Sequence, residues 1–383
     1  MPRSTRRSMA ASWTTAMSKA LYLIIGGFLG AGKTTAIRRI ARHLANRGLR
    51  VGLITNDQSH GLVDTTLLRT EEFPVEEITG GCFCCRFNSL IDASEKLSAG
   101  GRPDVFIAEP VGSCTDLVAT VSFPLRRIYG EAYRVVPLSV LVDPIRAERM
   151  IGLESGRNFS RRVLYVYAKQ LEEAGAIVIN KCDLISPERQ DRLEAALRRA
   201  YGRADVYRVS ARAGSGMEHW IDSLIAGSGG AESAPDLDYE LYAEGEALLG
   251  WLNASVSLRA ERGIDGNELL WTLALRIRDA LGRFEIAHLK MTLVPTEQAG
   301  DIGVINLVRT DAKPEVSHSL RAPLAAGVLL INLRAEAEPD LLRHSVADAI
   351  AGCGCQAEIT HLEHFRPSKP QPTHRMSAHP LAG

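Results

Sequence analysis

Short apolar runs alternate with longer segments in which apolar residues recur every three or four positions over the first 226 residues. Continuous apolar runs are typical of strands buried on both faces, and the 3.6-residue spacing is typical of helices packed on a sheet. Strands are predicted at 21–26, 51–55, 75–79, 104–108, 138–142, 176–179 and 206–209. Helices are predicted at 32–47, 88–97, 159–173, 187–197 and 217–225, with a loop and a short helix at 57–72.

This alternation predicts the fold class of the N-terminal part of the chain. Strands that alternate with helices form right-handed crossovers, and repeated crossovers build a mainly parallel sheet. We therefore expect an α/β domain with helices on both faces of its sheet.

The pattern changes near residue 227. Residues 227–236 are rich in Gly, Ala and Ser, a composition typical of a flexible linker. The order β-α-β-β-β-α-β that follows predicts a smaller α+β domain, for which a ferredoxin-like arrangement is one candidate. The expected division is a disordered extension at 1–19, an α/β domain at 20–226, the linker at 227–236, an α+β domain at 237–366 and a flexible tail at 367–383.

A glycine-rich loop lies between the first strand and the first helix. Its sequence, GFLGAGKTT, meets the pattern G-x-x-x-x-G-K-[ST] with Gly27, Gly32, Lys33 and Thr34. Glycines, including Gly30, let successive N–H groups point at phosphate oxygens. Lys33 supplies charge to the β- and γ-phosphates, and the Thr34 hydroxyl is a ligand for Mg²⁺. By itself the loop predicts a binding site for a nucleoside triphosphate.

A second motif selects the base. Asn180, Lys181 and Asp183 form N-K-x-D at the end of a predicted strand, and Ser210-Ala211 follows the next strand. The Asp carboxylate accepts from both N1–H and the exocyclic amine of guanine, whereas adenine has a lone pair at N1. A buried carboxylate facing adenine would be left unpaired, at a large cost. The expected nucleotide is GTP. An ATP-using kinase or synthetase remains an alternative.

Acidic residues end three strands. Glu109 occupies the position of the acid near Mg²⁺ and the attacking water in P-loop proteins, so Lys33 and Glu109 are the candidate catalytic residues. Asp57 and Asp143 also end strands, and for these two a structural role and a functional role are both open.

Five of the seven cysteines lie in two tight clusters. Cys82, Cys84 and Cys85 follow a strand and two glycines, and their spacing suits a soft, tetrahedral metal ion such as Zn²⁺ or Cu(I), with a fourth ligand from elsewhere. The alternative is that they are small core residues. Cys114 and Cys182 are expected to be incidental. A second site remains open for the residues Cys353, Cys355, His361 and His364.

Composition narrows the range of partners and compartments. The 383 residues contain 45 Lys plus Arg and 45 Asp plus Glu, so no net field favours nucleic acid or a membrane surface. No secretory signal precedes the cysteines, which favours the reducing cytoplasm. The basic N-terminus also leaves open a transit peptide, or a start at Met17 in place of Met1. A homo-oligomer is left open.

These motifs in this order resemble the CobW-like family of metal-associated P-loop GTPases, relatives of the GTPases that help insert nickel into hydrogenase and urease. The resemblance covers about residues 20–226 and implies a GTP-hydrolysing metallochaperone. It implies that phosphate and Mg²⁺ are held by Gly27, Gly30, Ala31, Gly32, Lys33, Thr34 and Thr35. It further implies that Cys82, Cys84 and Cys85 bind the transferred metal. The family's N-E-x-G is here Asn56-Asp57-Gln58-Ser59, and the second domain matches the family weakly.

The expected function is GTP hydrolysis coupled to the binding and delivery of a transition metal, Zn²⁺ being the first candidate, to a client metalloprotein. The alternative is a GTP-dependent accessory protein for cobalamin biosynthesis or for a corrinoid enzyme, in which the cysteines are structural.

Overall fold

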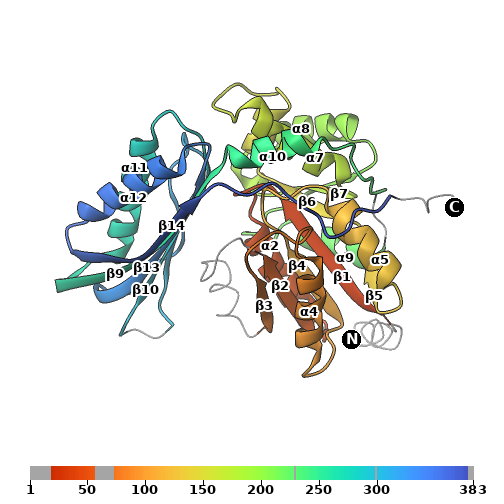
Figure 1. The fold of residues 1–383 in the computed structure, drawn as a ribbon, viewed down its shortest axis with the longest axis horizontal. Helices are drawn as coiled ribbons and strands as arrows, with labels where there is room; N and C mark the ends of the chain where they lie inside the picture. The colour runs from red at the N-terminus through yellow and green to blue at the C-terminus, as the bar shows by residue number, and fades with distance from the viewer. Residues whose placement is uncertain (1–18, 57–72, 228–229, 298–299, 378–383) are drawn as a thin grey trace, which may run out of the picture.

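The computed structural model describes residues 19–56, 73–227, 230–297 and 300–377. Two sheets dominate this part of the chain: a parallel sheet surrounded by helices, and an antiparallel sheet with helices on its outer face (Figure 1). The predicted fold class, a mainly parallel α/β domain followed by a smaller α+β unit, is confirmed.

Within the described residues, the first sheet has eight strands, all paired in parallel, in the order β3-β2-β4-β1-β6-β7-β8 with β5 beside β1. Its strands are β1 (Ala20–Gly27), β2 (Val51–Asn56), β3 (Val75–Ile78), β4 (Val105–Glu109), β5 (Tyr133–Val135), β6 (Ser139–Val142), β7 (Ala176–Ile179) and β8 (Asp205–Arg208). The order changes direction at β1, so the loops that follow β1 and β4 meet at a switch point, where open α/β sheets bind ligands.

Helices cover both faces of this sheet. They are α2 (Lys33–Ala45), α4 (Phe87–Ser98), α5 (Phe123–Ile128), α6 (Pro144–Met150), α7 (Arg161–Glu173), α8 (Pro187–Ala200) and α9 (Met217–Ala226). Apolar residues of α2 and α9 pack with Leu21, Leu23 and Ile25 on one face. Those of α4, α5, α7 and α8 pack with Tyr22 and Ile24 on the other. Alternate residues of β1 thus face opposite cores, which is why the whole strand reads as apolar.

Several short elements were not predicted. They are β5, α5, α6, a π-helical turn at Val118–Ser122 and a 3-10 turn at Cys182–Leu184. Helix α6 carried a local signal, because Asp143 caps it by accepting from the Arg146 N–H and Pro144 is its first residue.

The second sheet has six strands among the described residues, in the order β12-β11-β10-β13-β9-β14, and its pairs are antiparallel. They are β9 (Gly250–Ile264), β10 (Ile286–Pro295), β11 (Gly303–Leu307), β12 (Glu315–His318), β13 (Leu324–Ala335) and β14 (Gln356–Phe365). Helices α11 (Gly266–Leu281) and α12 (Pro339–Ala351) pack on one face. Strand β12 was missing from the predicted order, since none of its residues is fully buried and only Val316 is apolar.

The segment between the sheets packs on the first one. Helix α10 (Tyr239–Ala247) lies against α7, with Tyr242 and Leu237 around Val166. Upstream, the buried Glu232 side chain accepts from the Leu138 N–H and pairs with Arg126 at 2.5 Å. The described part of the expected linker is therefore held by specific contacts that a composition rich in Gly and Ser does not reveal.

The C-terminal tail also differs from the expectation. After β14 the chain runs back across the first domain, as the dark-blue trace in Figure 1 shows. The Thr373 N–H donates to the Cys84 carbonyl at 2.8 Å, and the Met376 N–H donates to that of Ala119 at 2.8 Å. Residues 367–377 are therefore docked rather than loose. No described helix is long and apolar enough to cross a membrane.

Candidate functional site

The loop from β1 to α2 has the shape its sequence predicts. Gly32, which precedes α2, has a φ of 88°, and a Cβ there would lie 2.5 Å from Nδ2 of Asn180. Only glycine satisfies both the left-handed backbone and this approach. Lys33 is 8% exposed, and its ammonium group donates to the Gly27 carbonyl at 2.9 Å. The lysine is thus held across the loop, at the N-terminus of a helix, where an anion is favoured.

Side chains of the N-K-x-D segment form hydrogen bonds with the phosphate loop and with the loop at Ala211. Nδ2 of Asn180 donates to the Ala31 carbonyl at 2.8 Å, and its Oδ1 accepts from the Ala211 N–H at 3.0 Å. Lys181, in a left-handed conformation with a φ of 55°, donates to the Gly30 carbonyl at 2.7 Å. The motif that was predicted to recognise guanine therefore also positions the phosphate loop.

A cavity of about 580 Å³ lies over these loops. Predicted site residues that line it are Gly30, Gly32, Lys33, Thr34, Thr35, Glu109, Asn180, Lys181, Asp183 and Ala211. Asp183 is exposed at the surface of the cavity. Gly27, Ala31 and Ser210 support the loops by hydrogen bonds, and the buried Ser210 hydroxyl accepts from the Ala213 N–H at 3.1 Å.

Glu109 and Thr34 meet at the end of β4. The Thr34 hydroxyl lies 3.0 and 3.2 Å from the two Glu109 oxygens, and Glu109 is 8% exposed. A carboxylate and a hydroxyl beside a lysine-bearing phosphate loop are hard oxygen donors, which is the donor set that Mg²⁺ prefers. These residues therefore fit the ion. Asp57, the other acid predicted near this point, lies outside the described residues.

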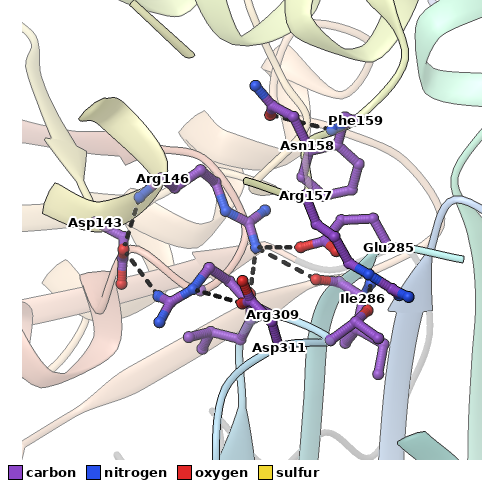
Figure 2. Close-up of polar contacts among 12 residues, drawn as sticks. Asp143, Arg146, Arg157, Asn158, Phe159, Glu285, Ile286, Arg309 and Asp311 are labelled. Atoms are coloured by element: carbon purple, nitrogen blue, oxygen red, sulfur yellow. Dashed lines mark hydrogen bonds and ion pairs between the residues drawn. The ribbon is translucent and has the colours of Figure 1, made fainter. Parts of the chain in front are cut away.

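Asp143 joins the site to the second sheet. Its carboxylate accepts from Lys181 at 3.0 Å. It also accepts from Arg309, which follows β11, at 3.2 Å (Figure 2). Burial alone would raise its pKa, but the charges of Lys181, Arg309 and Arg146 outweigh burial and lower the pKa to about 2. Asp143 is therefore an ion-paired helix cap beside the cavity.

Arg146 extends this interface. Its guanidinium lies 3.9 Å from Glu285 and donates to the Ile286 carbonyl at 3.2 Å, both in the second part of the chain (Figure 2). Its Cζ also lies 4.6 Å from the centroid of the Phe159 ring. In addition, a Cβ on Gly30 would lie 3.0 Å from the side chain of Val308. The second domain therefore touches the phosphate loop itself.

Three predicted thiols converge. The Sγ atoms of Cys82, Cys84 and Cys85 are separated by 2.7, 3.3 and 3.6 Å. They lie on a turn in which the N–H groups of Cys85 and Arg86 both donate to the Cys82 carbonyl. Hydrogen bonds from neighbouring thiols, that of Cys114 first, hold the pKa of Cys82 well below its usual value. Three thiols on one turn are the donor set of a soft metal site.

Sequence reasoning missed two residues beside this cluster. Cys114, which was expected to be incidental, is 1% exposed, and its thiol is the main influence that lowers the pKa of Cys82. Glu246 of α10 is buried nearby, where burial and the charge of Cys82 raise its pKa to about 8. Neither residue belongs to a local motif, so only the fold brings them to the thiols.

Two short connections join the cavity to the cysteines. Asn56, at the end of β2, lines the cavity, and its Nδ2 donates to the carbonyls of Gly81 at 2.7 Å and Ile78 at 3.1 Å. The loop after β4 runs from Glu109 to Cys114. Each connection begins at the predicted nucleotide site and ends at the thiols or at the turn before them.

The tail covers the cysteine turn. The Gln371 N–H donates to Sγ of Cys85 at 3.2 Å, and the Thr373 hydroxyl donates to the Cys85 carbonyl at 3.1 Å. Arg375 anchors this segment to the buried Asp116 at 2.8 Å. We call residues 371–376 the strap.

The second candidate metal site, at Cys353, Cys355, His361 and His364, does not form one cluster of ligand atoms. Sγ of Cys353 and Sγ of Cys355 lie 3.4 Å apart, but His364 faces Asp340 at 3.8 Å. In the part of the chain that the structure describes, Cys82, Cys84 and Cys85 are the one group of three or more potential ligands lying within 4.8 Å of one another.

Comparison with known proteins identifies the N-terminal part. Residues 21–208 match the family model "CobW/HypB/UreG, nucleotide-binding domain". The chain is 26% identical over 204 residues to zinc-regulated GTPase metalloprotein activator 1 of Dictyostelium discoideum, covering 46% of this chain and 42% of that protein. It is 26% identical over 200 residues to zinc chaperone YjiA of Escherichia coli, covering 51% of this chain and 58% of that protein. It is 31% identical over 186 residues to zinc chaperone CobW of Sinorhizobium sp, covering 42% of this chain and 51% of that protein. The chain thus spans about half the length of these curated relatives.

Proposed function

Because residues 21–208 belong to the CobW/HypB/UreG nucleotide-binding domain family, we propose that the protein hydrolyses GTP to GDP and couples this to the binding and delivery of a zinc ion. The observation that carries the proposal is the pair of short connections, Asn56 to Gly81 and Glu109 to Cys114, between the nucleotide cavity and the thiols. The names of three relatives, which refer to zinc, support the choice of metal.

The P-loop residues hold the triphosphate in this proposal. Backbone N–H groups from Gly27 to Thr35 receive phosphate oxygens, and Lys33 leaves the Gly27 carbonyl to pair with the β- and γ-phosphates. Thr34 would hold Mg²⁺, and the ion would supply positive charge against the phosphates. Asp183 accepts from guanine N1–H and the exocyclic amine, the Lys181 stem lies against the ring, and the Ser210-Ala211 loop backs the base.

Glu109 positions the attacking water. Its carboxylate lies at the end of β4 beside Thr34, so an oxygen of the carboxylate is available to accept a hydrogen bond from water aligned with the γ-phosphate. Water attacks phosphorus, the bond to the β-phosphate oxygen breaks, and inorganic phosphate and GDP leave.

Loss of the γ-phosphate moves the loop after Glu109 and the Asn56 contact with Gly81. Since both end at the cysteine turn, the arrangement of the thiols changes with the nucleotide. One arrangement binds the zinc cargo tightly and the other releases it to a client metalloprotein. The reducing cytoplasm is the compartment in which such free thiols persist.

Zinc affinity measured in two nucleotide states tests the proposal. Competition with a chromophoric chelator gives the Zn²⁺ affinity of the wild type and of Cys84→Ser, each with GDP and with a non-hydrolysable GTP analogue. We expect the wild-type affinity to differ between the two nucleotides and Cys84→Ser to bind weakly with both. Equal affinity in all four samples would contradict the coupling of GTP to metal.

A further inference from the structure

We propose that Cys353 and Cys355 are a thiol–disulfide exchange site, which reduces a small-molecule disulfide and closes a disulfide bond across Gly354. The two sulfur atoms lie 3.4 Å apart, and Sγ of Cys353 also donates to the Cys355 carbonyl at 3.5 Å. A disulfide bond is about 2.05 Å long, so the sulfur atoms have about 1.3 Å left to close. The pair belongs neither to the residues that line the nucleotide cavity nor to the cluster of three thiols, and its chemistry goes beyond the metal-handling function.

A glycine in the left-handed conformation joins the two cysteines. The pair connects α12 to β14, and Gly354 between them has a φ of 78°. Nothing lies within 4 Å of the Cβ that another residue would have at this position. Glycine is therefore favoured here by its backbone conformation rather than by close packing, and this conformation reverses the chain so that the flanking side chains lie next to each other.

Both ends of this turn are held by the second domain. The Cys353 N–H donates to the Ile350 carbonyl at 3.0 Å, and the guanidinium of Arg276 on α11 donates to the Gly352 carbonyl. On the other side, β14 begins at Gln356 and pairs with β9. The two thiols are thus presented from fixed backbone positions, so closing the bond requires little further ordering of the chain.

The pair is accessible to dissolved reagents. Cys353 and Cys355 are both half-exposed, and they pack against the outside of the second hydrophobic core. Cys82 and Cys84, in contrast, are buried in the first core. Because exchange requires that a sulfur be reached by the incoming disulfide, accessible thiols react and buried ones resist. A small-molecule disulfide therefore meets the pair before it meets the two buried thiols.

The exchange proceeds in two balanced steps. The thiolate of Cys353 attacks one sulfur of the small-molecule disulfide, the S–S bond breaks, and one small thiol leaves. The sulfur of Cys355 then attacks Sγ of Cys353, and the second small thiol leaves. The pair loses two electrons, the small-molecule disulfide gains them, and the two thiol protons of the pair end on the two released thiols.

The neighbouring sulfur decides which cysteine attacks first. Burial, and after it the sulfur of Cys353, raises the pKa of the Cys355 thiol above its usual value, so Cys355 keeps its proton while Cys353 is ionised. Once Cys353 is bonded to a small thiol it carries no charge, and its part of the shift disappears. Cys355 then ionises more readily and displaces the small thiol.

Mass spectrometry of tryptic fragments follows this pair alone, because fragment 344–375 contains no other cysteine. Full-length wild type and Cys355→Ser, both loaded with Zn²⁺, are treated with glutathione disulfide. We expect the wild-type fragment to lose two hydrogen atoms and to carry no glutathione. Cys355→Ser cannot close the ring, so its fragment should carry at least about tenfold more glutathione adduct than that of wild type. Cys182, half-exposed and outside both clusters, is the internal control and should gain glutathione.

The outcomes decide the proposal without reference to the cargo metal. Excess reduced glutathione should reopen the wild-type ring, since the exchange is reversible. A wild-type fragment that gains two glutathione molecules, or that stays reduced while Cys182 reacts, would overturn the proposal, and this reading requires no variant to fold. Cys353→Ser should bind Zn²⁺ as wild type does with either nucleotide; weaker binding would assign the pair to the metal and overturn the exchange site, while leaving the metal-handling function in place.

Discussion

Nη1 of Arg309 lies 3.2 Å from Oδ1 of Asp143, and this contact joins the second sheet to the residue that pairs with Lys181 of the N-K-x-D segment. Asp143 is 3% exposed. A buried carboxylate between two cations from different domains holds the domains together, because separating either ion pair would leave a buried charge unpaired. The second domain is thus mechanically connected to the nucleotide site.

The pH dependence of stability checks the charge on Asp143. Its pKa is lowered to about 2, so its ionised form stabilises the fold above its unfolded pKa of about 4, by about 2 kcal/mol, and the contribution is lost as pH falls from about 4 to 2. We expect Asp143→Asn to unfold at lower urea than wild type at pH 7, with the difference shrinking toward pH 2. Asp205→Asn, at an exposed position, is the control; a pH-independent difference for Asp143→Asn would refute the assignment.

Base selection by Asp183 is testable by exchanging the base. An Asn side chain offers one donor and one acceptor, which complements xanthine, whereas guanine offers two donors. We expect Asp183→Asn to bind GTP about 100-fold more weakly and to gain affinity for xanthosine triphosphate. Calorimetric titration with both nucleotides measures this. Unchanged GTP affinity would show that Asp183 does not contact the base.

Gly32 is expected to tolerate no side chain. Gly32→Ala places a Cβ 2.5 Å from Nδ2 of Asn180 and strains a φ of +88°, so nucleotide affinity should fall by more than tenfold. Gly48→Ala is a matched control, since its φ is +83° but nothing lies within 4 Å of the new Cβ. That change should cost about 1 kcal/mol of stability and leave nucleotide binding intact. Equal nucleotide affinity for the two variants would contradict the clash.

We expect the contact between Asn56 and Gly81 to contribute to the dependence of Zn²⁺ affinity on the bound nucleotide. Asn56→Ala removes the amide that donates to the carbonyls of Gly81 and Ile78. We expect the difference in Zn²⁺ affinity between GDP and the GTP analogue to shrink, while Zn²⁺ still binds to the thiols. A full wild-type difference in this variant would assign the coupling to the loop of Glu109 alone.

The strap should shield Cys85. Truncation after residue 367 removes the Gln371 N–H that donates to its sulfur, so the thiol reagent DTNB should react several-fold faster at this position. Subtracting the rate of the same truncation carrying Cys85→Ser isolates that thiol. Arg375→Ala, which breaks the anchor on Asp116, should give an intermediate rate. An unchanged rate would mean that the strap does not protect Cys85.

Local patterns accounted for most of the regular structure. Strand β1 and helix α2 were predicted nearly to their ends, because continuous apolar residues and a 3.6-residue stripe are properties of adjacent positions. The docked strap was missed, because it is held by backbone hydrogen bonds and by Arg375 rather than by apolar residues. Strand β12 was missed for a similar reason: it pairs through its backbone at the sheet edge.

The sequence by itself determined the parallel fold and the motif residues of the phosphate loop, the guanine loop and the cysteine turn, because each is a contiguous stretch with its own chemistry. Only the tertiary structure decided that Cys114 and Glu246 are buried where they influence the thiols, that Arg309 reaches Asp143, and that the chain returns over Cys85. These contacts join residues far apart in sequence, and the path of the chain between them sets the distance. No local pattern of residues records that path.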